Sequence, residues 1–227
     1  TFGFEDIVVK LSTRPEQRVG DDATWDKSEA ALANALDENN VKFEYLPGEG
    51  AFYGPKIDFH LKDAIGRTWQ CGTIQVDFSM PEKFDLEYDG KDGQKHRPVM
   101  VHRAILGSLE RFLGILIEHY AGRFPLWLSP LQVKILTVND DCIKFAEEIE
   151  NKLKENNIKV ELDVRQESIS KKVRDAQNQQ ANYMITIGEK EVKSKKLAVR
   201  TREGKVSFGV SSDNFIKDLV KELKDKK

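Results

Sequence analysis

The sequence predicts two domains of different architecture: an α+β domain built on an antiparallel sheet, then an α/β domain with a mixed, mainly parallel sheet. Strand-like runs follow one another between amphipathic helices in the first half, whereas strands and helices alternate in the second half. The 227 residues, 39% hydrophobic and 33% charged, suffice for two packed cores and argue against a disordered chain. No window approaches the roughly 18 apolar residues of a membrane-spanning helix, so no membrane partner is expected.

The first domain is predicted to begin with a strand over residues 7–11 and a helix over residues 25–38. The helix has one apolar face, formed by Trp25, Leu32, Ala33 and Leu36. Further strands are predicted over residues 41–46, 51–61 and 67–78, with a hairpin turn at residues 62–66. A helix over residues 104–122 ends the domain, and its apolar stripe is Leu109, Phe112, Leu113, Leu116, Ile117 and Tyr120.

The two domains meet at a segment that contains Pro125 and Pro130, which remove amide donors and restrict their neighbours. We therefore divide the chain into residues 1–124, a linker over residues 125–130, and residues 131–227. In the second domain, strands are predicted over residues 133–138, 159–164, 183–188, 196–202 and 206–210. Helices are predicted over residues 141–155, 168–180 and 213–224, and Ser168 is the expected N-cap of the second.

Charge is distributed unevenly between the two parts. Residues 1–130 carry 15 basic and 21 acidic side chains, whereas residues 131–227 carry 21 and 17. Residues 165–205 alone hold 11 basic and 5 acidic groups, which suits either a surface for a polyanion or a solvated lysine-rich face. Three cations of the predicted helix lie off its apolar positions and are expected to be free for phosphate or single-stranded bases: Lys171, Lys172 and Arg174.

The two cysteines, Cys71 and Cys142, do not supply a disulfide framework, which favours a reducing, cytoplasmic location. The first residues carry neither a basic nor an apolar signal region, so no secretory signal is expected. Cys71 and the four histidines match no zinc-ligand spacing, and on spacing alone His102 is an ordinary core or surface histidine.

Two segments concentrate groups that chemistry uses. Residues 48–56, GEGAFYGPK, place three glycines before Lys56, which suits either a close backbone approach to a phosphate or carboxylate, or a bulged entry into a strand. In a strand over residues 70–78, one face carries Cys71, Thr73, Gln75 and Asp77, and the other carries Gln70, Gly72, Ile74 and Val76. The polar face is therefore either solvent-facing or the floor of a polar ligand site, because buried unpaired polar groups are costly.

Arg111 follows Glu110 on the predicted helix, opposite the apolar stripe. A surface ion pair of little energetic value and an arginine directed into a phosphate site are both compatible with this position. The sequence contains neither Gly-x-Ser-x-Gly nor His-Glu-x-x-His, which argues against those two hydrolase classes.

Four longer strings carry a resemblance to a known family. They are STRPE at residues 12–16, GEGAFYGPK at residues 48–56, WQCGTIQVDF at residues 69–78 and VHRAILGSLERF at residues 101–112. Together they resemble the threonyl-tRNA synthetase family, bacterial type, among the class II aminoacyl-tRNA synthetases. The resemblance covers the whole chain and implies the last part of a class II catalytic domain followed by an anticodon-binding domain.

The resemblance implies that threonine and ATP form threonyl-adenylate, and that threonine then passes to the 3′ end of tRNA(Thr). Catalysis would rest on Lys56 and Arg111, and ATP would contact Gln70, Thr73, Ser108 and Arg111. Threonine would contact Tyr53, Cys71 and Gln75, and His102 would be one ligand of a zinc ion. The anticodon would contact Arg165, Gln166, Arg174, Glu191 and Arg200.

Mg²⁺ bound with ATP and a homodimer are further expectations from the resemblance. The family's motifs 1 and 2 and its other two zinc ligands correspond to sequence ahead of Thr1, so these 227 residues alone are expected to be catalytically incomplete. Two alternatives stay open: a non-catalytic RNA-binding or regulatory relative, and a class II synthetase of another specificity.

Overall fold

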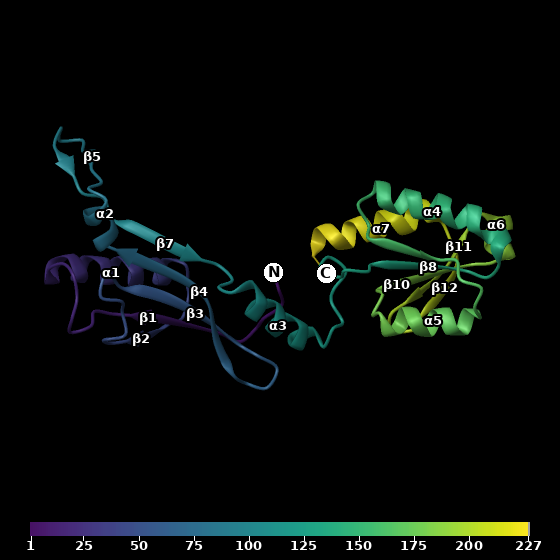
Figure 1. Cartoon of the computed structure of the whole chain (residues 1–227), viewed down its shortest axis with the longest axis horizontal. Coiled ribbons are helices and arrows are strands. Elements are labelled where there is room, and N and C mark those ends of the chain that lie inside the picture. Colours follow the sequence, from purple (N-terminus) through teal and green to yellow (C-terminus); the bar gives the residue numbers. More distant parts are fainter. Residues whose placement is uncertain (227) are drawn as a thin grey trace. The chain divides into compact units, whose positions relative to one another are not determined.

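The computed structural model describes residues 1–226 and divides into two compact units, Thr1–His119 and the chain from Tyr120 onward (Figure 1). The first unit contains a five-stranded sheet in the order β2-β1-β3-β4-β7, antiparallel except for the parallel pair β1–β2. Its strands are β1 (Ile7–Ser12), β2 (Glu44–Leu46), β3 (Lys56–Lys62), β4 (Thr68–Asp77) and β7 (Met100–Ala104). The remaining elements are α1 (Asp22–Glu38), α2 (Ser79–Lys83), α3 (Leu109–Tyr120) and a small hairpin of β5 (Tyr88–Asp89) and β6 (Lys95–His96).

Helix α1 covers one face of this sheet, as its hydrophobic spacing predicted. The side chain of Asp21 caps the helix by accepting a hydrogen bond from the Thr24 amide. The predicted inward residues Trp25, Leu32, Ala33 and Leu36 are all buried. Three of them pack in one cluster with sheet residues that include Leu11, Ile57 and Val76. Apolar burial on this face leaves the other face of β3 and β4 available for polar side chains.

The predicted turn between β3 and β4 is held by a buried carboxylate. Asp63 accepts hydrogen bonds from the Ile65 and Arg67 amides, from Arg67 Nε at 2.5 Å and from Trp69 Nε1 at 2.9 Å. Burial raises the pKa of Asp63, but these four donors outweigh it and lower the pKa from 3.8 to about 2. The ionised form of Asp63 therefore stabilises the hairpin that carries β3 and β4.

Two expected elements of the first unit, and the burial of one apolar stripe, differ from the structure. The strand predicted over residues 51–61 begins only at Lys56, because Ala51 bridges to Gly54 in a tight turn. Residues 100–104 form strand β7 and the helix begins at Leu109, so the predicted helix over residues 104–122 was too long. Its predicted stripe is only partly buried: Phe112 and Leu116 are inside, whereas Leu109, Leu113 and Ile117 are at least half exposed.

The second unit is a mixed sheet in the order β12-β11-β10-β8-β9, in which β10, β8 and β9 are parallel and β11 and β12 antiparallel. Its strands are β8 (Val133–Thr137), β9 (Val160–Asp163), β10 (Tyr183–Ile187), β11 (Leu197–Thr201) and β12 (Val206–Val210). Its helices are η1 (Asp140–Cys142), α4 (Ile143–Glu155), α5 (Ile169–Asn178), α6 (Glu189–Ser194) and α7 (Ser212–Asp225). Both predicted fold classes are confirmed.

Within the second unit, α4 and α7 lie on one face of the sheet and α5 on the other (Figure 1). The main core lies under α4 and α7, where Ile135, Leu153 and Leu219 are fully buried. The chain leaves β8 through α4 and leaves β9 through α5, so the connections diverge to opposite faces at the carboxyl ends of these neighbouring strands. Ligands of parallel α/β sheets bind where connections diverge in this way.

The segment that we expected to be a linker packs onto the second unit. Leu126 is fully buried, and its carbonyl accepts a hydrogen bond from Gln132 Nε2 at 2.8 Å. The Phe124 carbonyl accepts hydrogen bonds from Asn182 and Arg202. Across residues 1–226, no helix is long and apolar enough to cross a bilayer.

We expect Asp63→Asn to weaken the first unit near neutral pH and to flatten its acid sensitivity. Because the folded pKa of Asp63 lies below its ordinary value, its stabilisation is fully present above about pH 4 and is lost as the pH falls toward 2. Urea denaturation from neutral pH to about pH 2 measures this. The exposed Asp37→Asn variant is the control and should keep the wild-type pH profile. Equal slopes for wild type and Asp63→Asn would contradict the assignment.

Candidate functional site

The face of the first sheet opposite α1 carries a row of polar side chains from three neighbouring strands. Lys56 of β3 pairs with Gln75 of β4, which pairs on its other side with His102 of β7. In the next row, Asp58 pairs with Thr73. Directly paired residues project their side chains to the same face of a sheet. We call this set the polar face; it consists of Lys56, Asp58, Gln70, Thr73, Gln75, Asp77 and His102.

Gln70 belongs to the polar face because of a bulge in the β3–β4 register. The strand alternation predicted that Gln70 points to the opposite face, and that prediction was wrong. The pairing shifts between Phe59↔Gly72 and His60↔Gln70, so β4 has one extra residue, Cys71, at this point. The shift returns Gln70 to the side of Asp58, whose Oδ1 accepts a hydrogen bond from Gln70 Nε2 at 2.6 Å.

Cys71 itself lies away from the polar face. It is buried and lines a mainly apolar cavity of about 350 Å³ with Phe59, Ile74 and Phe112. Burial raises the pKa of the Cys71 thiol, so the thiolate is disfavoured. Tyr53 and Gln75, the other two residues expected to contact threonine, are not among the residues that line this cavity.

The glycine-rich string places Tyr53 against the end of β4. The Tyr53 carbonyl accepts a hydrogen bond from the Phe78 amide, and the Pro55 carbonyl accepts one from the Val76 amide, both at 3.0 Å. A Cβ on Gly54 would lie 1.9 Å from the Val76 carbonyl oxygen, so this approach requires glycine. As a result, Tyr53 Oη donates a hydrogen bond to Gln75 Oε1 at 3.2 Å.

Carboxylates position two cationic or ionisable groups on the polar face. Lys56 Nζ lies 2.9 Å from Oδ2 of the buried Asp58. His102 Nε2 lies 2.8 Å from Oδ2 of the buried Asp77, whose Oδ1 also accepts the Ser79 and Met80 amides. Burial raises the pKa of Asp77, but its hydrogen bonds outweigh this and the net pKa lies below the ordinary value. Asp77 is therefore an anion that fixes the orientation of the His102 ring.

Four buried polar atoms on this side of the sheet have no hydrogen-bond partner among the described residues. Thr73 Oγ1 and Gln75 Nε2 belong to the polar face, and Ser12 Oγ and His60 Nδ1 belong to residues paired directly with Lys56 and Gln70. Buried polar groups are nearly always paired, and leaving one unpaired costs about 1–3 kcal/mol. A donor and an acceptor in adjacent rows of the sheet, next to Lys56, are suited to a small polar ligand with charged groups.

Helix α3 places Arg111 at the Gln70 end of the polar face. Gly107 precedes the helix with a φ of +66°, and a Cβ there would lie 2.6 Å from the Cys71 carbonyl oxygen. Ser108 Oγ accepts a hydrogen bond from the Arg111 amide and donates one to Glu110. Arg111 Nη1 donates to the Gln70 carbonyl at 3.2 Å, and its guanidinium lies 5.5 Å from the Trp69 ring. Arg111 is thus joined to the polar face, while Glu110 is engaged by Ser108.

The described residues contain no group of three or more histidine, cysteine or acidic side chains that could hold a metal ion. His102 alone fits one position of a zinc site, because its ring is 44% exposed and Asp77 already occupies one ring nitrogen. The structure brings Tyr53, Lys56, Gln70, Thr73, Gln75, His102 and Arg111 together through direct contacts or neighbouring register positions. Asp58 joins this group although sequence patterns did not identify it; its place opposite Thr73 depends on the register.

In the second unit, a pocket of about 320 Å³ lies at the carboxyl ends of β8 and β9. We call it the strand-end pocket; its lining includes Asn139, Asp140, Arg165, Gln166 and Lys172. Gln166 Nε2 lies 3.4 Å from Asp140 Oδ2, a long hydrogen bond. The sequence-expected pair Arg165 and Gln166 therefore reaches one pocket at the divergence of the two connections.

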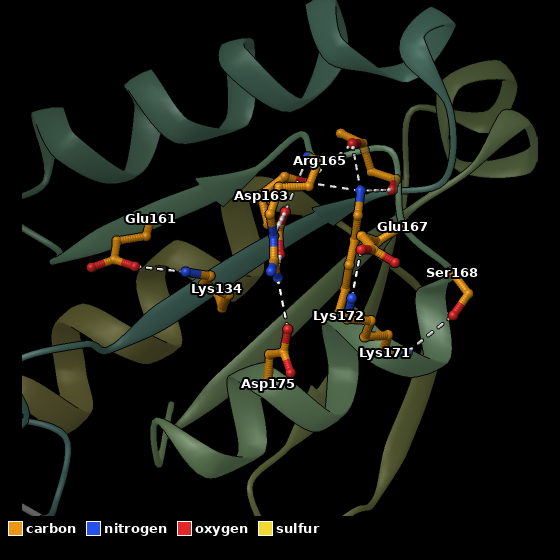
Figure 2. A network of polar contacts seen from close by, with 10 residues as sticks. Lys134, Glu161, Asp163, Arg165, Glu167, Ser168, Lys171, Lys172 and Asp175 are labelled. Atoms are coloured by element: carbon orange, nitrogen blue, oxygen red, sulfur yellow. Dashed lines mark hydrogen bonds and ion pairs between the residues drawn. The ribbon is translucent and has the colours of Figure 1, made fainter.

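Arg165 is engaged by two carboxylates. Its Nη2 lies 2.6 Å from Asp163 Oδ2 and 3.0 Å from Asp175 Oδ2, and its Nε donates to Asp163 Oδ1 (Figure 2). The Arg165 guanidinium holds the pKa of Asp163 below its ordinary value. These contacts fix the first residues of the loop that follows β9.

The other expected anticodon residues are spread over the unit. Glu191 follows β10 at the same sheet edge as the strand-end pocket, and its carboxylate accepts a hydrogen bond from the Gly188 amide at 3.0 Å. Arg174 is exposed on α5. Arg200 lies near the far end of the antiparallel strand β11, opposite Met184. Lys172, which we expected to be free at the surface, is instead buried, with 1% of its surface exposed.

Comparison with known proteins matches both units. Residues 1–120 match the family model described as tRNA synthetase class II core domain (G, H, P, S and T), and residues 132–222 match the anticodon binding domain. The threonine–tRNA ligase of Desulfatibacillum aliphaticivorans is 55% identical over 97% of this chain and 34% of that protein. The threonine–tRNA ligase of Clostridium botulinum is 55% identical over 99% of this chain and 35% of its own length. The chain thus spans about a third of the length of these relatives.

Solved structures of tRNA synthetases match the chain as well. The RNA binding domain of threonyl-tRNA synthetase from Cryptosporidium parvum matches with a TM-score of 0.89 and 40% identity, over 97% of this chain and 56% of that one. Prolyl-tRNA synthetase from Giardia lamblia matches with a TM-score of 0.62 over 77% of this chain and 40% of that one, but at 17% identity it supports the fold alone. By the match over more than half of its residues, the chain belongs to the class II tRNA synthetase core domain family.

Proposed function

We propose that this chain forms part of a threonine–tRNA ligase. In this proposal the polar face binds threonine and ATP, and the second unit binds the anticodon stem-loop of tRNA(Thr). The observation that carries the proposal is the pair of unpartnered polar atoms, Thr73 Oγ1 and Gln75 Nε2, on a face bordered by Lys56 and Arg111. The identity to threonine–tRNA ligases supports threonine as the amino acid.

Adenylate formation on the polar face needs no general base. The threonine carboxylate is already an anion at neutral pH and attacks the α-phosphorus of ATP, while the bond from that phosphorus to pyrophosphate breaks. Lys56, held by Asp58, would neutralise the charge that builds on the α-phosphate, and Arg111 would bind the pyrophosphate end of ATP. Gln70, Thr73 and Ser108 would contact the nucleotide, which carries Mg²⁺ as its counterion.

Threonine would lie beside Tyr53 and Gln75. The Tyr53 hydroxyl orients the Gln75 amide, so that Nε2 is the group left to bind the substrate. His102 would be one ligand of a zinc ion, and zinc would supply a Lewis acid that holds the amine and hydroxyl of threonine. A site that binds the hydroxyl would reject valine strongly but would admit serine. Cys71 would act from behind the sheet, as part of the wall that supports Gln70.

In the second step, the terminal ribose hydroxyl of tRNA attacks the adenylate carbonyl and AMP leaves. The second unit would hold the tRNA by its anticodon, with Arg165 and Gln166 at the strand-end pocket and Glu191 at the same edge. Arg174 and Arg200 would contact the RNA elsewhere on the unit, consistent with the positive charge of residues 165–205. The proposed division is residues 1–124 for chemistry, 125–130 as connection and 131–227 for the anticodon. A homodimer and a cytoplasmic location are part of the same proposal.

In the intact ligase we expect Arg111→Ala to lower threonine-dependent ATP–pyrophosphate exchange by about 10²–10³-fold, because a charge-stabilising donor is lost. The affinity for tRNA should change little, because the proposal places Arg111 at the pyrophosphate end of ATP and the anticodon contacts in the second unit. Lys83→Ala, an exposed cation of the same unit, is the control and should leave exchange intact. Exchange with proline or glycine in place of threonine would reject the proposed specificity.

The Arg200→Ala variant should produce the opposite pattern. We expect its affinity for tRNA(Thr) to fall by about 5–100-fold, while ATP–pyrophosphate exchange keeps the wild-type rate. The matched control is Lys217→Ala. Lys217 is an exposed cation on α7, which covers the face of the sheet opposite α5. If Arg111→Ala and Arg200→Ala impair the same step, the assignment of separate roles to the two units is wrong.

A further inference from the structure

Lys172 is a buried ammonium on α5 that joins the ends of two parallel strands. Its Nζ donates to the Thr137 carbonyl at 2.8 Å and to the Asp163 carbonyl at 3.2 Å, and lies 3.5 Å from Thr137 Oγ1. Thr137 is the last residue of β8, and Asp163 is the last residue of β9. Figure 2 shows the Lys172 side chain extending from α5 to the point where these strands end.

The partners of Lys172 differ from those of an ordinary surface lysine. Its neighbour Lys171 is partly exposed and pairs with Glu167 at 2.5 Å. Lys172 has no carboxylate within ion-pair distance among the described residues, because the side chain of Asp163 faces Arg165. Burying a charge with only neutral acceptors is expensive, and an apolar side chain would suit a core position better. A lysine at this position therefore points to a role in geometry and not in overall stability.

The geometry that Lys172 controls is that of the strand-end pocket. The pocket lies between residues 137–140, which follow β8, and residues 164–167, which follow β9. Thr137 Oγ1 also donates to the Asp163 carbonyl at 3.2 Å, which adds a direct contact between the two strand ends. Arg165 then fixes the start of the second loop through Asp163 and Asp175. Among the described residues, the Gln166 side chain has only the long contact to Asp140, so its amide is available to a ligand.

We propose that Lys172 is a positioning residue that sets the width of the strand-end pocket and thereby lets Gln166 discriminate between single-stranded RNA bases. The inference rests on the proposed anticodon binding of the second unit and names Lys172 as the residue on which the selectivity of that binding depends. Lys172 borders the pocket, but 1% of its surface is exposed and its Nζ is taken up by the Thr137 and Asp163 carbonyls, so in this proposal it acts through those carbonyls and not by binding the RNA. It neutralises no phosphate, so its removal should change base selectivity and leave the salt dependence of binding unchanged.

The test compares Lys172→Met with Lys171→Met in the 227-residue chain. Binding is measured with an RNA stem-loop that carries the tRNA(Thr) anticodon and with stem-loops in which single anticodon bases are changed. For Lys172→Met we expect the ratio between matched and changed stem-loops to fall by about 10-fold, with an unaltered slope of affinity against salt. For Lys171→Met we expect wild-type selectivity and at most a shallower salt slope, because its cation is at the surface.

The possible outcomes distinguish a failure of this inference from a failure of the proposed function. A folded Lys172→Met chain, verified by urea denaturation, that keeps wild-type selectivity would overturn the role of Lys172. A salt slope reduced by about one would instead make Lys172 a phosphate contact and would equally overturn it. If the wild-type chain itself fails to distinguish the stem-loops, the proposed anticodon function fails.

A milder variant decides the question if Lys172→Met does not fold. Thr137→Val removes the hydroxyl that joins Lys172 and the Asp163 carbonyl, while both backbone carbonyls keep their donor. We expect selectivity to fall by about 2–5-fold and the amides of residues 138–140 and 164–167 to exchange hydrogen faster. Unchanged selectivity and unchanged exchange in Thr137→Val would overturn the proposal.

Discussion

The pairing register of β3 with β4 determines which side chains meet on the polar face. Lys56, Asp58 and Gln75 lie together because each register pair projects to one side of the sheet. The single bulge at Cys71 then brings Gln70 to the same side, and the Gln70 carbonyl in turn receives Arg111 from α3. Without the extra residue, the Gln70 side chain would point to the other face and lose its hydrogen bond to Asp58. The series of contacts from Arg111 through Gln70 to Asp58 would then be interrupted.

The second unit reaches a comparable result by a different device. Its three parallel strands end at one edge, and the connections from β8 and β9 leave toward opposite faces, which opens a space between the two loops. Polar contacts then define that space: the carboxylates of Asp163 and Asp175 hold Arg165, and Lys172 holds the strand ends. In both units, the side chains proposed to bind a ligand are held in place by other side chains that are not proposed to touch it.

Periodicity predicted the buried face of α1 correctly, because Trp25, Leu32 and Leu36 recur over several turns, but it missed the first turn, which begins at Asp22 after the Asp21 cap. Alternation placed Thr73, Gln75 and Asp77 on one face correctly but was wrong for Cys71 and Gln70, since a bulge leaves no clear mark in a single sequence. The helical pattern likewise marked Lys172 as off the apolar stripe, yet the carbonyls that receive its ammonium come from strands far away in the sequence. The roles expected for Tyr53 and His102 came only from the resemblance of longer strings to a known family, because residue spacing alone indicated no role for either.

Strand β7 pairs with β4 alone among the described strands, so the backbone groups on its other side form an open border of the sheet. Val101 is 61% exposed on that strand, and Ile105, directly after its last residue, is 68% exposed. An open strand border beside apolar side chains is a template for strand addition by another polypeptide. Concentrated solutions of these 227 residues would therefore be prone to self-association through this border of the first unit.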